Sequence, residues 1–273
     1  MASKWVAFMT RWNRSTQVLR DNTSAILRMD GLNPPNRSPM ALCSFNTKEE
    51  LQRYSIGVDS DVGGTSTAHL DFVPNPYDPN GKGTARFWGD MRLGVRNDLR
   101  GKIRGGYAGF RSKSRPTLFG ELADDISNHE YLALRVRAGG HPRTRNAYFV
   151  NLQTDSPISG ELWQHRLYFR KNDGSWEDIF IPFSAFALTS YGELATGRAS
   201  EVTIEEDRIR WLGISLLGGN AGVEGPFELG LDSIKAVNQE DVLTPPIADQ
   251  RPRDVDREVE DVDENLWQRD RTS

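Results

Sequence analysis

Three neighbouring segments decide the fold of this chain: NAYFVNLQTD (146–155), ELWQHRLYFR (161–170) and WEDIFIPFSAF (176–186). Each segment alternates apolar with polar side chains or runs apolar, and each is bounded by Asp, Ser, Pro or Gly. This pattern is typical of antiparallel β-strands joined by turns. The sequence therefore predicts a strand-rich core at this point of the chain.

Four polar residues lie inside these strands: Asn151, Gln153, Gln164 and His165. Polar residues within strands either line a binding face or form hydrogen bonds inside the core. In strict alternation Asn151 and Gln153 share one face of the sheet, whereas Gln164 and His165 point to opposite faces. At most three of the four can therefore line a single face.

The strand pattern continues on both sides of this stretch. The further segments are TAHLDFV (67–73), TARFWGDMRL (84–93), GGYAGFRSK (105–113), EYLALRVRA (130–138), IRWLGISLLG (209–218) and PFELGLDSIKAV (226–237). With AILRM (25–29), they make about ten strands without alternating helices, which predicts an all-β, antiparallel double-sheet jelly roll. A short helix is expected in 46–54, opened by a cap at Asn46 or Thr47.

Composition divides the chain into four parts. We expect an amphipathic segment at 1–20, a strand and a proline-rich loop at 21–39, a β-sandwich at 40–237, and an acidic, disordered tail at 238–273. The tail carries eleven acidic and five basic residues, a net charge of −6, which leaves +2 for the other 237 residues. A short helix within 257–267 that docks on a partner is the alternative for the tail.

The first 20 residues contain basic but no acidic side chains. The basic residues are Lys4, Arg11, Arg14 and Arg20, and the large apolar ones are Trp5, Phe8, Met9 and Trp12. Their spacing predicts a helix with one apolar face. Such a helix resembles a mitochondrial targeting segment, but a helix packed on the domain has the same composition.

Overall composition excludes several classes of protein. A net charge of −4 argues against a nucleic-acid partner. The single cysteine, Cys43, rules out an intrachain disulfide and suits a small core residue in a reducing compartment. No segment approaches the roughly 18 consecutive apolar residues of a membrane span, so we expect membrane contact to be peripheral or through partners.

Catalytic and metal-binding motifs are not found. The four histidines show no ligand spacing, and the sequence has no nucleophile elbow, Walker loop or dinucleotide fingerprint, so we expect neither a metal nor a cofactor. Asp59 to Gly64 begins like a calcium loop, but a turn fixed by Asx hydrogen bonds accounts for it better. Arg104 to Lys113 could bind phosphate or an acidic partner, or could be a strand with glycines at a close approach.

The ordered set of motifs resembles the complex I intermediate-associated protein 30 family. The motifs are SDVGGTSTAHLDF, ARFWGDMRL, GGYAGFRSK, YLALRVRAGG, NAYFVNLQTD, LWQHRLYF, WEDIFIPFSAFALTSYGE, RIRWLGISLLGG and GPFELGLDSIKA, within about 42–237. The resemblance implies a galactose-binding-domain-like sandwich, related to carbohydrate-binding modules. It also implies a mitochondrial assembly factor for NADH:ubiquinone oxidoreductase, on the matrix side of the inner membrane, that contacts membrane-arm intermediates and other assembly factors.

A chaperone or scaffold of this kind binds through aromatic and arginine anchors. The candidates are Trp88, Tyr107, Phe110, Arg111, Trp163 and Trp176, although each could be a core residue instead. The alternative function is glycan binding on a concave sheet through the four polar strand residues. We expect those four residues to have structural roles.

Overall fold

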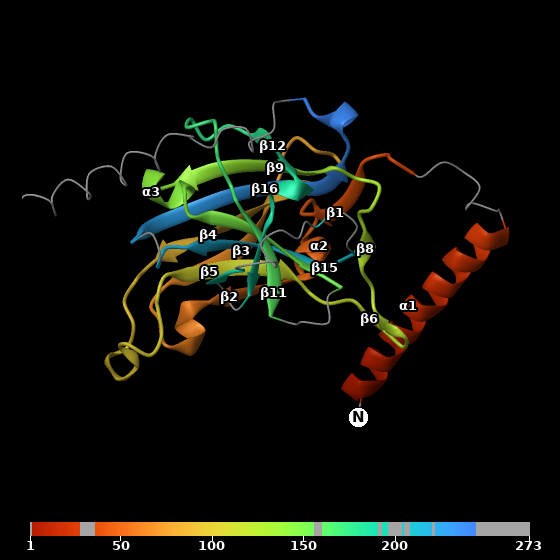
Figure 1. Cartoon of the computed structure of the whole chain (residues 1–273), viewed down its shortest axis with the longest axis horizontal. Coiled ribbons are helices and arrows are strands. Elements are labelled where there is room, and N and C mark those ends of the chain that lie inside the picture. The colour runs from red at the N-terminus through yellow and green to blue at the C-terminus, as the bar shows by residue number, and fades with distance from the viewer. Residues whose placement is uncertain are drawn as a thin grey trace, which may run out of the picture.

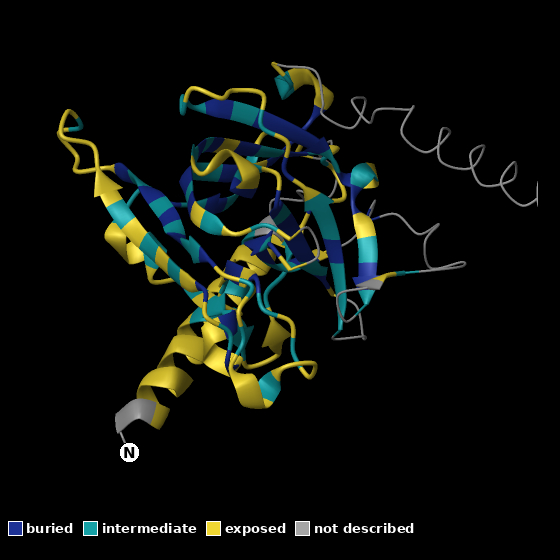
Figure 2. Cartoon of the chain, turned by 90° about the vertical axis from the view of Figure 1, so that its left-hand side faces the viewer, coloured by how far each residue is buried: buried dark blue, intermediate teal, exposed yellow. Residues whose placement is uncertain are grey.

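Alternating side chains build two facing antiparallel sheets in the computed structural model of this chain (Figure 1). The structure describes residues 2–27, 36–155, 160–190, 193–195, 204, 208–219 and 222–243. The clearest alternation is in β4 (Gly83–Met91), where buried and half-buried residues follow one another along the whole strand. Figure 2 shows bands of buried and half-buried residues along several strands.

In the part of the chain that the structure describes, sheet A has six strands, all paired antiparallel. In order of pairing they are β12 (Glu177–Pro182), β9 (Tyr131–Gly140), β16 (Gly225–Val237), β4 and β3 (Thr67–Pro74), with β1 (Met40–Ser44) also on β16.

Sheet B has eight strands among the described residues, also paired antiparallel. In order of pairing they are β14 (Glu193–Leu194), β13 (Ala187–Ser190), β11 (Glu161–Arg166), β10 (Tyr148–Thr154), β15 (Arg208–Leu217), β5 (Tyr107–Ser112) and β2 (Tyr54–Val58), with β8 (Asp124–Asp125) also on β15.

Helices, a small hairpin and 3₁₀ turns complete the described structure. The helices are α1 (Ala2–Leu27), α2 (Lys48–Leu51) and α3 (Pro142–Arg145), the hairpin strands are β6 (Pro116–Thr117) and β7 (Gly120–Glu121), and 3₁₀ turns lie at Asp59–Val62, Asn97–Leu99, Phe183–Ala185 and Gln239–Asp241. Thr47 caps α2, which is one of the two caps that the sequence predicts, and Glu50 returns the bond in a capping box.

The core lies between the two sheets. Sheet A contributes fully buried residues such as Phe87 and Leu229, and sheet B contributes Val150 and Ile214. These side chains belong to one contiguous cluster, which removes their apolar surface from water and holds the sheets face to face. The predicted all-β sandwich is confirmed.

The two ends of the chain differ from the prediction. Residues 25–27 of the predicted strand 25–29 are helical, because α1 extends through Leu27. Residues 28–35 lie outside the described residues. The start of the tail is also ordered, since Asn238 is buried and its side-chain amide donates to the carbonyl oxygen of Arg37 at 2.8 Å. The rest of the tail, 244–273, lies outside the described residues.

Candidate functional site

The register of three central strands of sheet B decides where the predicted polar residues lie. Asn151 on β10 stands opposite Gln164 on β11, so these two residues and Gln153 share the outer face of the sheet. His165 stands opposite Val150 and shares its inner face, with its ring 5.6 Å from that of Phe186. Three of the four polar residues thus come together, and His165 is separate.

A groove of about 530 Å³ runs across this outer face. Two of its lining residues, Gly57 and Gly109, are paired with each other on β2 and β5 and have no side chain to fill the space. Tyr107, Arg111 and Trp211 stand around it, and the Arg111 guanidinium lies 5.2 Å from the centre of the Trp211 ring. We call the groove and its outward-facing side chains the sheet B face.

Hydrogen bonds tie the polar residues of the sheet B face to one another. The side-chain amide of Asn151 donates to Ser215 Oγ at 2.9 Å, and Gln164 Nε2 donates to Asn151 Oδ1 at 2.8 Å. Trp211 Nε1 donates to Gln153 Oε1. These bonds join β11, β10 and β15 within one sheet and stabilise their pairing. Asn151 is only 7% exposed, which suits this structural role.

Two of the six predicted partner anchors are core residues. Phe110 and Trp163 are 3% and 4% exposed. Phe110 packs edge-on against Phe87, with 5.1 Å between the ring centres, and Trp163 faces inward beside Leu152. For these two residues the structure shows the core position that the sequence left open as the alternative, because the alternation of their strands turns both side chains into the sandwich.

The other four predicted anchors are accessible but lie on opposite faces. Tyr107 and Arg111 belong to the sheet B face. Trp88 and Trp176 lie half-buried on the outer face of sheet A, each next to an arginine; Arg86 is 4.8 Å from the Trp88 ring centre. A partner that docks on one face therefore cannot use all four residues.

The loop that resembles a calcium site uses its first carboxylate internally. Asp59 is buried and accepts hydrogen bonds from the backbone N–H and the hydroxyl of Ser66, both at 2.9 Å, and from the N–H of Gly106 at 2.5 Å. The carboxylate thus fixes the 59–66 loop to the start of β5. Within the described ranges, no three His, Cys, Asp or Glu side chains gather as a metal-binding group.

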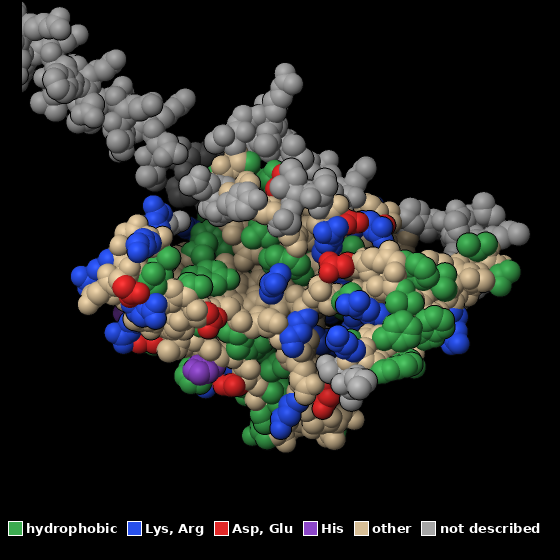
Figure 3. Space-filling view, turned by 90° about the horizontal axis from the view of Figure 1, so that it is seen from below, with side chains coloured by type: hydrophobic (Ala, Val, Ile, Leu, Met, Phe, Trp, Pro, Cys, Tyr) green, Lys and Arg blue, Asp and Glu red, His purple; other side chains and the backbone are tan. Residues whose placement is uncertain are grey.

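Helix α1 presents an apolar face to solvent. Trp5, Phe8 and Trp12 are 67%, 45% and 49% exposed, and their rings follow one another with centres 6.1 and 6.3 Å apart. Figure 3 shows hydrophobic side chains gathered at one end of the molecule, beside Lys and Arg side chains. No helix in the described part of the chain has both the length and the hydropathy of a membrane span.

An adjacent side of α1 is attached to the β6–β7 hairpin. The hydroxyl of Ser15, which is buried, accepts a hydrogen bond from the N–H of Leu118 at 2.9 Å. The Arg14 guanidinium donates to the carbonyl oxygen of Pro116 at 3.4 Å. The helix is therefore packed on the β6–β7 hairpin with its aromatic side outward. Of the two expectations for this segment, packing on the domain is observed, and targeting stays a prediction.

Comparison with known proteins identifies relatives of this chain. The family described as complex I intermediate-associated protein 30 (CIA30) matches residues 43–231. A Neurospora crassa protein named "Complex I intermediate-associated protein 30, mitochondrial" is 32% identical over 257 residues, 88% of either chain. Proteins of that name from Drosophila melanogaster and Mus musculus are each 28% identical over 70% of this chain, and the matches cover 60% and 53% of their own lengths.

Among solved structures, a family 11 carbohydrate-binding module from Clostridium thermocellum aligns with 75% of this chain and 98% of its own, with a TM-score of 0.48 and 14% identity. The evidence for the family is the match over 43–231 and the similarity along most of the fungal relative. On these grounds the chain belongs to the complex I intermediate-associated protein 30 family.

Proposed function

We propose that this protein is a non-catalytic assembly factor of mitochondrial respiratory complex I. It acts on the matrix side of the inner membrane, where it binds membrane-arm intermediates, together with other assembly factors, through protein contacts. Relatives from a fungus, a fly and a mouse, all named as mitochondrial proteins associated with complex I intermediates, support this function. Membrane contact in this proposal is peripheral or through partners.

The observation that carries the contact mechanism is the uncovered aromatic face of α1. Exposing the row of Trp5, Phe8 and Trp12 to water is unfavourable in free energy. Contact with an apolar partner surface removes these side chains from water and is therefore favourable. A subunit of an assembly intermediate exposes such an apolar surface until its neighbouring subunit binds. Aromatic side chains also dominate the energetics of protein interfaces.

The sheet B face extends this surface. Trp211 lines both its groove and a second pocket that Arg14 of α1 also lines, so the two regions are adjacent on the molecule. Tyr107 and Arg111 stand on the same face and are the predicted anchors that a partner held by α1 could reach. A rigid sandwich with these groups can shield an intermediate without becoming part of the finished enzyme.

Deletion of the gene in the source organism tests the proposal. Native gels of the deletion strain should show less mature complex I and an accumulation of membrane-arm subcomplexes. In a second strain that carries a tagged copy, the tagged protein should migrate with membrane-arm subcomplexes. Normal complex I in the deletion strain, with the tagged protein outside mitochondria, would remove the proposal.

Glycan binding on the sheet B face is the second candidate function. The observation in its favour is that Asn151, Gln153 and Gln164 lie on the same side of sheet B as the groove and Trp211. Such polar side chains can bind sugar hydroxyls, and a tryptophan can stack on a sugar ring. Their hydrogen bonds to one another and to neighbouring strands weigh against it. A glycan array in which the purified protein binds no glycan rejects this function.

A further inference from the structure

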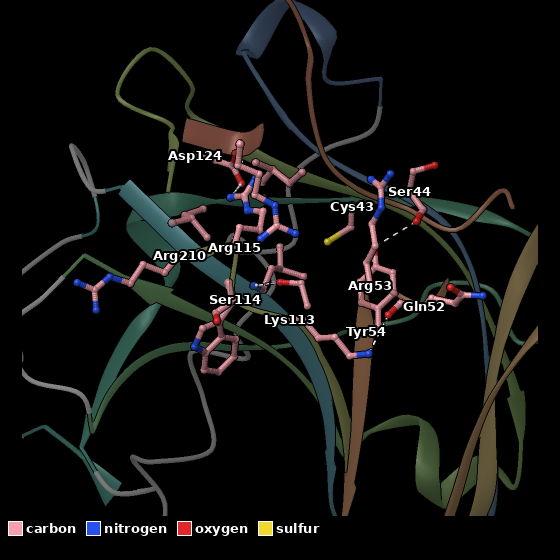
Figure 4. Close-up of a pocket in the computed structure, with 16 residues that line it drawn as sticks. Cys43, Ser44, Gln52, Arg53, Tyr54, Lys113, Ser114, Arg115, Asp124 and Arg210 are labelled. Atoms are coloured by element: carbon pink, nitrogen blue, oxygen red, sulfur yellow. Dashed lines mark hydrogen bonds and ion pairs between the residues drawn. The ribbon is translucent and has the colours of Figure 1, made fainter. Parts of the chain in front are cut away.

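A second pocket, of about 520 Å³, lies between α1 and the sandwich (Figure 4). Residues of α1, β1, β2, β5 and β15 contribute to its lining, together with the 113–115 segment. Among the described residues that line it, five are cationic and one, Asp124, is acidic. The cationic residues are Arg14, Arg53, Lys113, Arg115 and Arg210. We call this the basic pocket.

Carboxylates of the protein neutralise two of the five cations. Arg115 donates two parallel hydrogen bonds to Asp124, at 3.0 and 2.6 Å. Arg210 pairs with Asp155, and its side chain extends away from the other labelled residues in Figure 4.

The other three cations, Arg14, Arg53 and Lys113, have no carboxylate partner among the residues that the structure describes. The ammonium group of Lys113 donates to the carbonyl oxygen of Gln52 at 2.9 Å. The guanidinium of Arg14 donates to a carbonyl oxygen of the β6–β7 hairpin. Both groups keep further donors, and neither contact cancels their charge.

Three cations without a carboxylate partner line one cavity, and like charges repel one another. A bound anion removes this cost. Guanidinium forks match the geometry of phosphate oxygens, and an ammonium group adds a point charge. The volume lies within the range of roughly 300–1,000 Å³ that small-molecule sites occupy.

The cysteine that lines the pocket does not add reactive chemistry to it. Burial raises the pKa of the Cys43 thiol to about 12, so the group is a neutral thiol at physiological pH. A neutral thiol is neither a nucleophile nor a metal ligand. The basic pocket is therefore suited to binding, and Cys43 forms part of its apolar lining.

We propose that the basic pocket binds a phosphate group, carried either by a soluble anion or by a lipid headgroup. The charges of Arg53 and Lys113, which are exposed, and of Arg14 on α1 attract the phosphate. A bound phosphate links α1 to the sandwich, because it contacts cations from both.

The test uses the full chain and a double variant, R53Q/K113Q, which removes one arginine and one lysine charge from the pocket. The control, R100Q/K102Q, removes the same two charge types from exposed positions in the 97–106 loop. Titration calorimetry with pyrophosphate measures soluble binding. Flotation with phosphatidylcholine vesicles, with and without phosphatidic acid, measures headgroup binding. Thermal unfolding checks that both variants are folded.

Wild type and R100Q/K102Q should bind pyrophosphate or phosphatidic acid vesicles equally, and R53Q/K113Q should bind at least about tenfold more weakly. Pyrophosphate binding indicates a soluble ligand, and binding to vesicles alone indicates a headgroup. Equal losses in the two variants would show only a net-charge effect. Binding to neither probe overturns the proposal. Vesicle binding that R53Q/K113Q retains also overturns it, because that binding then belongs to Lys4 and Arg11 of α1.

Discussion

At the scale of single residues, the buried carboxylate of Asp59 accepts four hydrogen bonds. Replacing it with alanine leaves the buried N–H groups of Ser66 and Gly106 without their acceptor. We expect D59A to lower the free energy of unfolding by about 3 kcal/mol, measured by urea denaturation. D98A, in an exposed turn with one long contact to Arg96, should change it by less than about 0.5 kcal/mol. Equal stabilities of the two variants would contradict the assigned role.

Phe110 and Tyr107 make a matched pair on one strand, because alternation points them to opposite sides of sheet B. Phe110→Ala opens a cavity in the aromatic cluster and should cost about 3–5 kcal/mol of stability in urea denaturation. Tyr107 is 42% exposed, so Tyr107→Ala should cost less than half as much. A stable F110A protein would show that this side chain is not a core residue.

The buried thiol of Cys43 predicts a dependence on pH. Burial raises its pKa from an ordinary value near 9 to about 12. The folded state therefore keeps this proton to higher pH than the unfolded state does, and the stability linked to it is lost as pH rises from about 9 to 12. The sign follows because the unfolded chain binds fewer protons in this window.

Thiol reactivity gives the measurement. At pH 8 the folded protein should react with Ellman's reagent at least roughly a hundredfold more slowly than the urea-unfolded protein, because the thiolate is both rare and covered. In denaturation series above pH 9, wild type should lose stability more steeply than C43A. Fast modification of the folded protein, or parallel pH profiles, would show that Cys43 is accessible as a thiolate.

The sequence could predict part of the sheet B face. Alternation alone put Asn151 and Gln153 on one side of their strand. It did not decide between Gln164 and His165, because that choice depends on the register of β11 against β10, which is a non-local pairing. For Phe110 and Arg111 the signal was present: adjacent strand residues point to opposite faces, so they could not both contact one partner.

At the scale of elements, Ser15 holds α1 to the sandwich. Ser15→Ala removes the acceptor of the Leu118 N–H. Hydrogen exchange across 2–27 and 116–121 should become about fivefold faster, as expected for a loss of about 1 kcal/mol, while β4 and β16 stay protected. Thr16→Ala, at an exposed position bonded only within the helix, is the control and should leave exchange at 116–121 unchanged. Faster exchange throughout the protein would instead mean global destabilisation.

Long strands were predictable, and short ones were not. The nine segments with a sustained pattern from 67 to 237 are all strands in the structure. Two five-residue strands, β1 and β2, were missed, because a run that short has no period to distinguish it from a loop. AILRM has strand-forming side chains, but its first three residues continue α1, so the preceding helix outweighs their local preference.

At the scale of the whole molecule, the accessible anchors form two separate surfaces. Sheet A carries Trp88 and Trp176 on its outer face, and sheet B carries Tyr107 and Arg111. Helix α1 lies near the sheet B side, since its Arg14 and Trp211 of β15 line the same pocket. A partner that covers the aromatic face of α1 can reach the sheet B face, whereas the core separates it from the outer face of sheet A.

This asymmetry predicts which variants affect assembly. In a gene-deletion strain, Y107A/R111A should restore clearly less mature complex I than wild type on native gels, because it removes an aromatic and a cationic anchor near α1. W88A/W176A removes two larger aromatics from the outer face of sheet A and should restore wild-type amounts. Both proteins must accumulate equally and unfold at similar temperatures, so that a loss of complex I reflects contact and not folding. The reverse result, with only W88A/W176A defective, would place the partner on sheet A. Partial tryptic digestion of the tagged subcomplexes would then show protection of the sheet A loops instead of protection of α1.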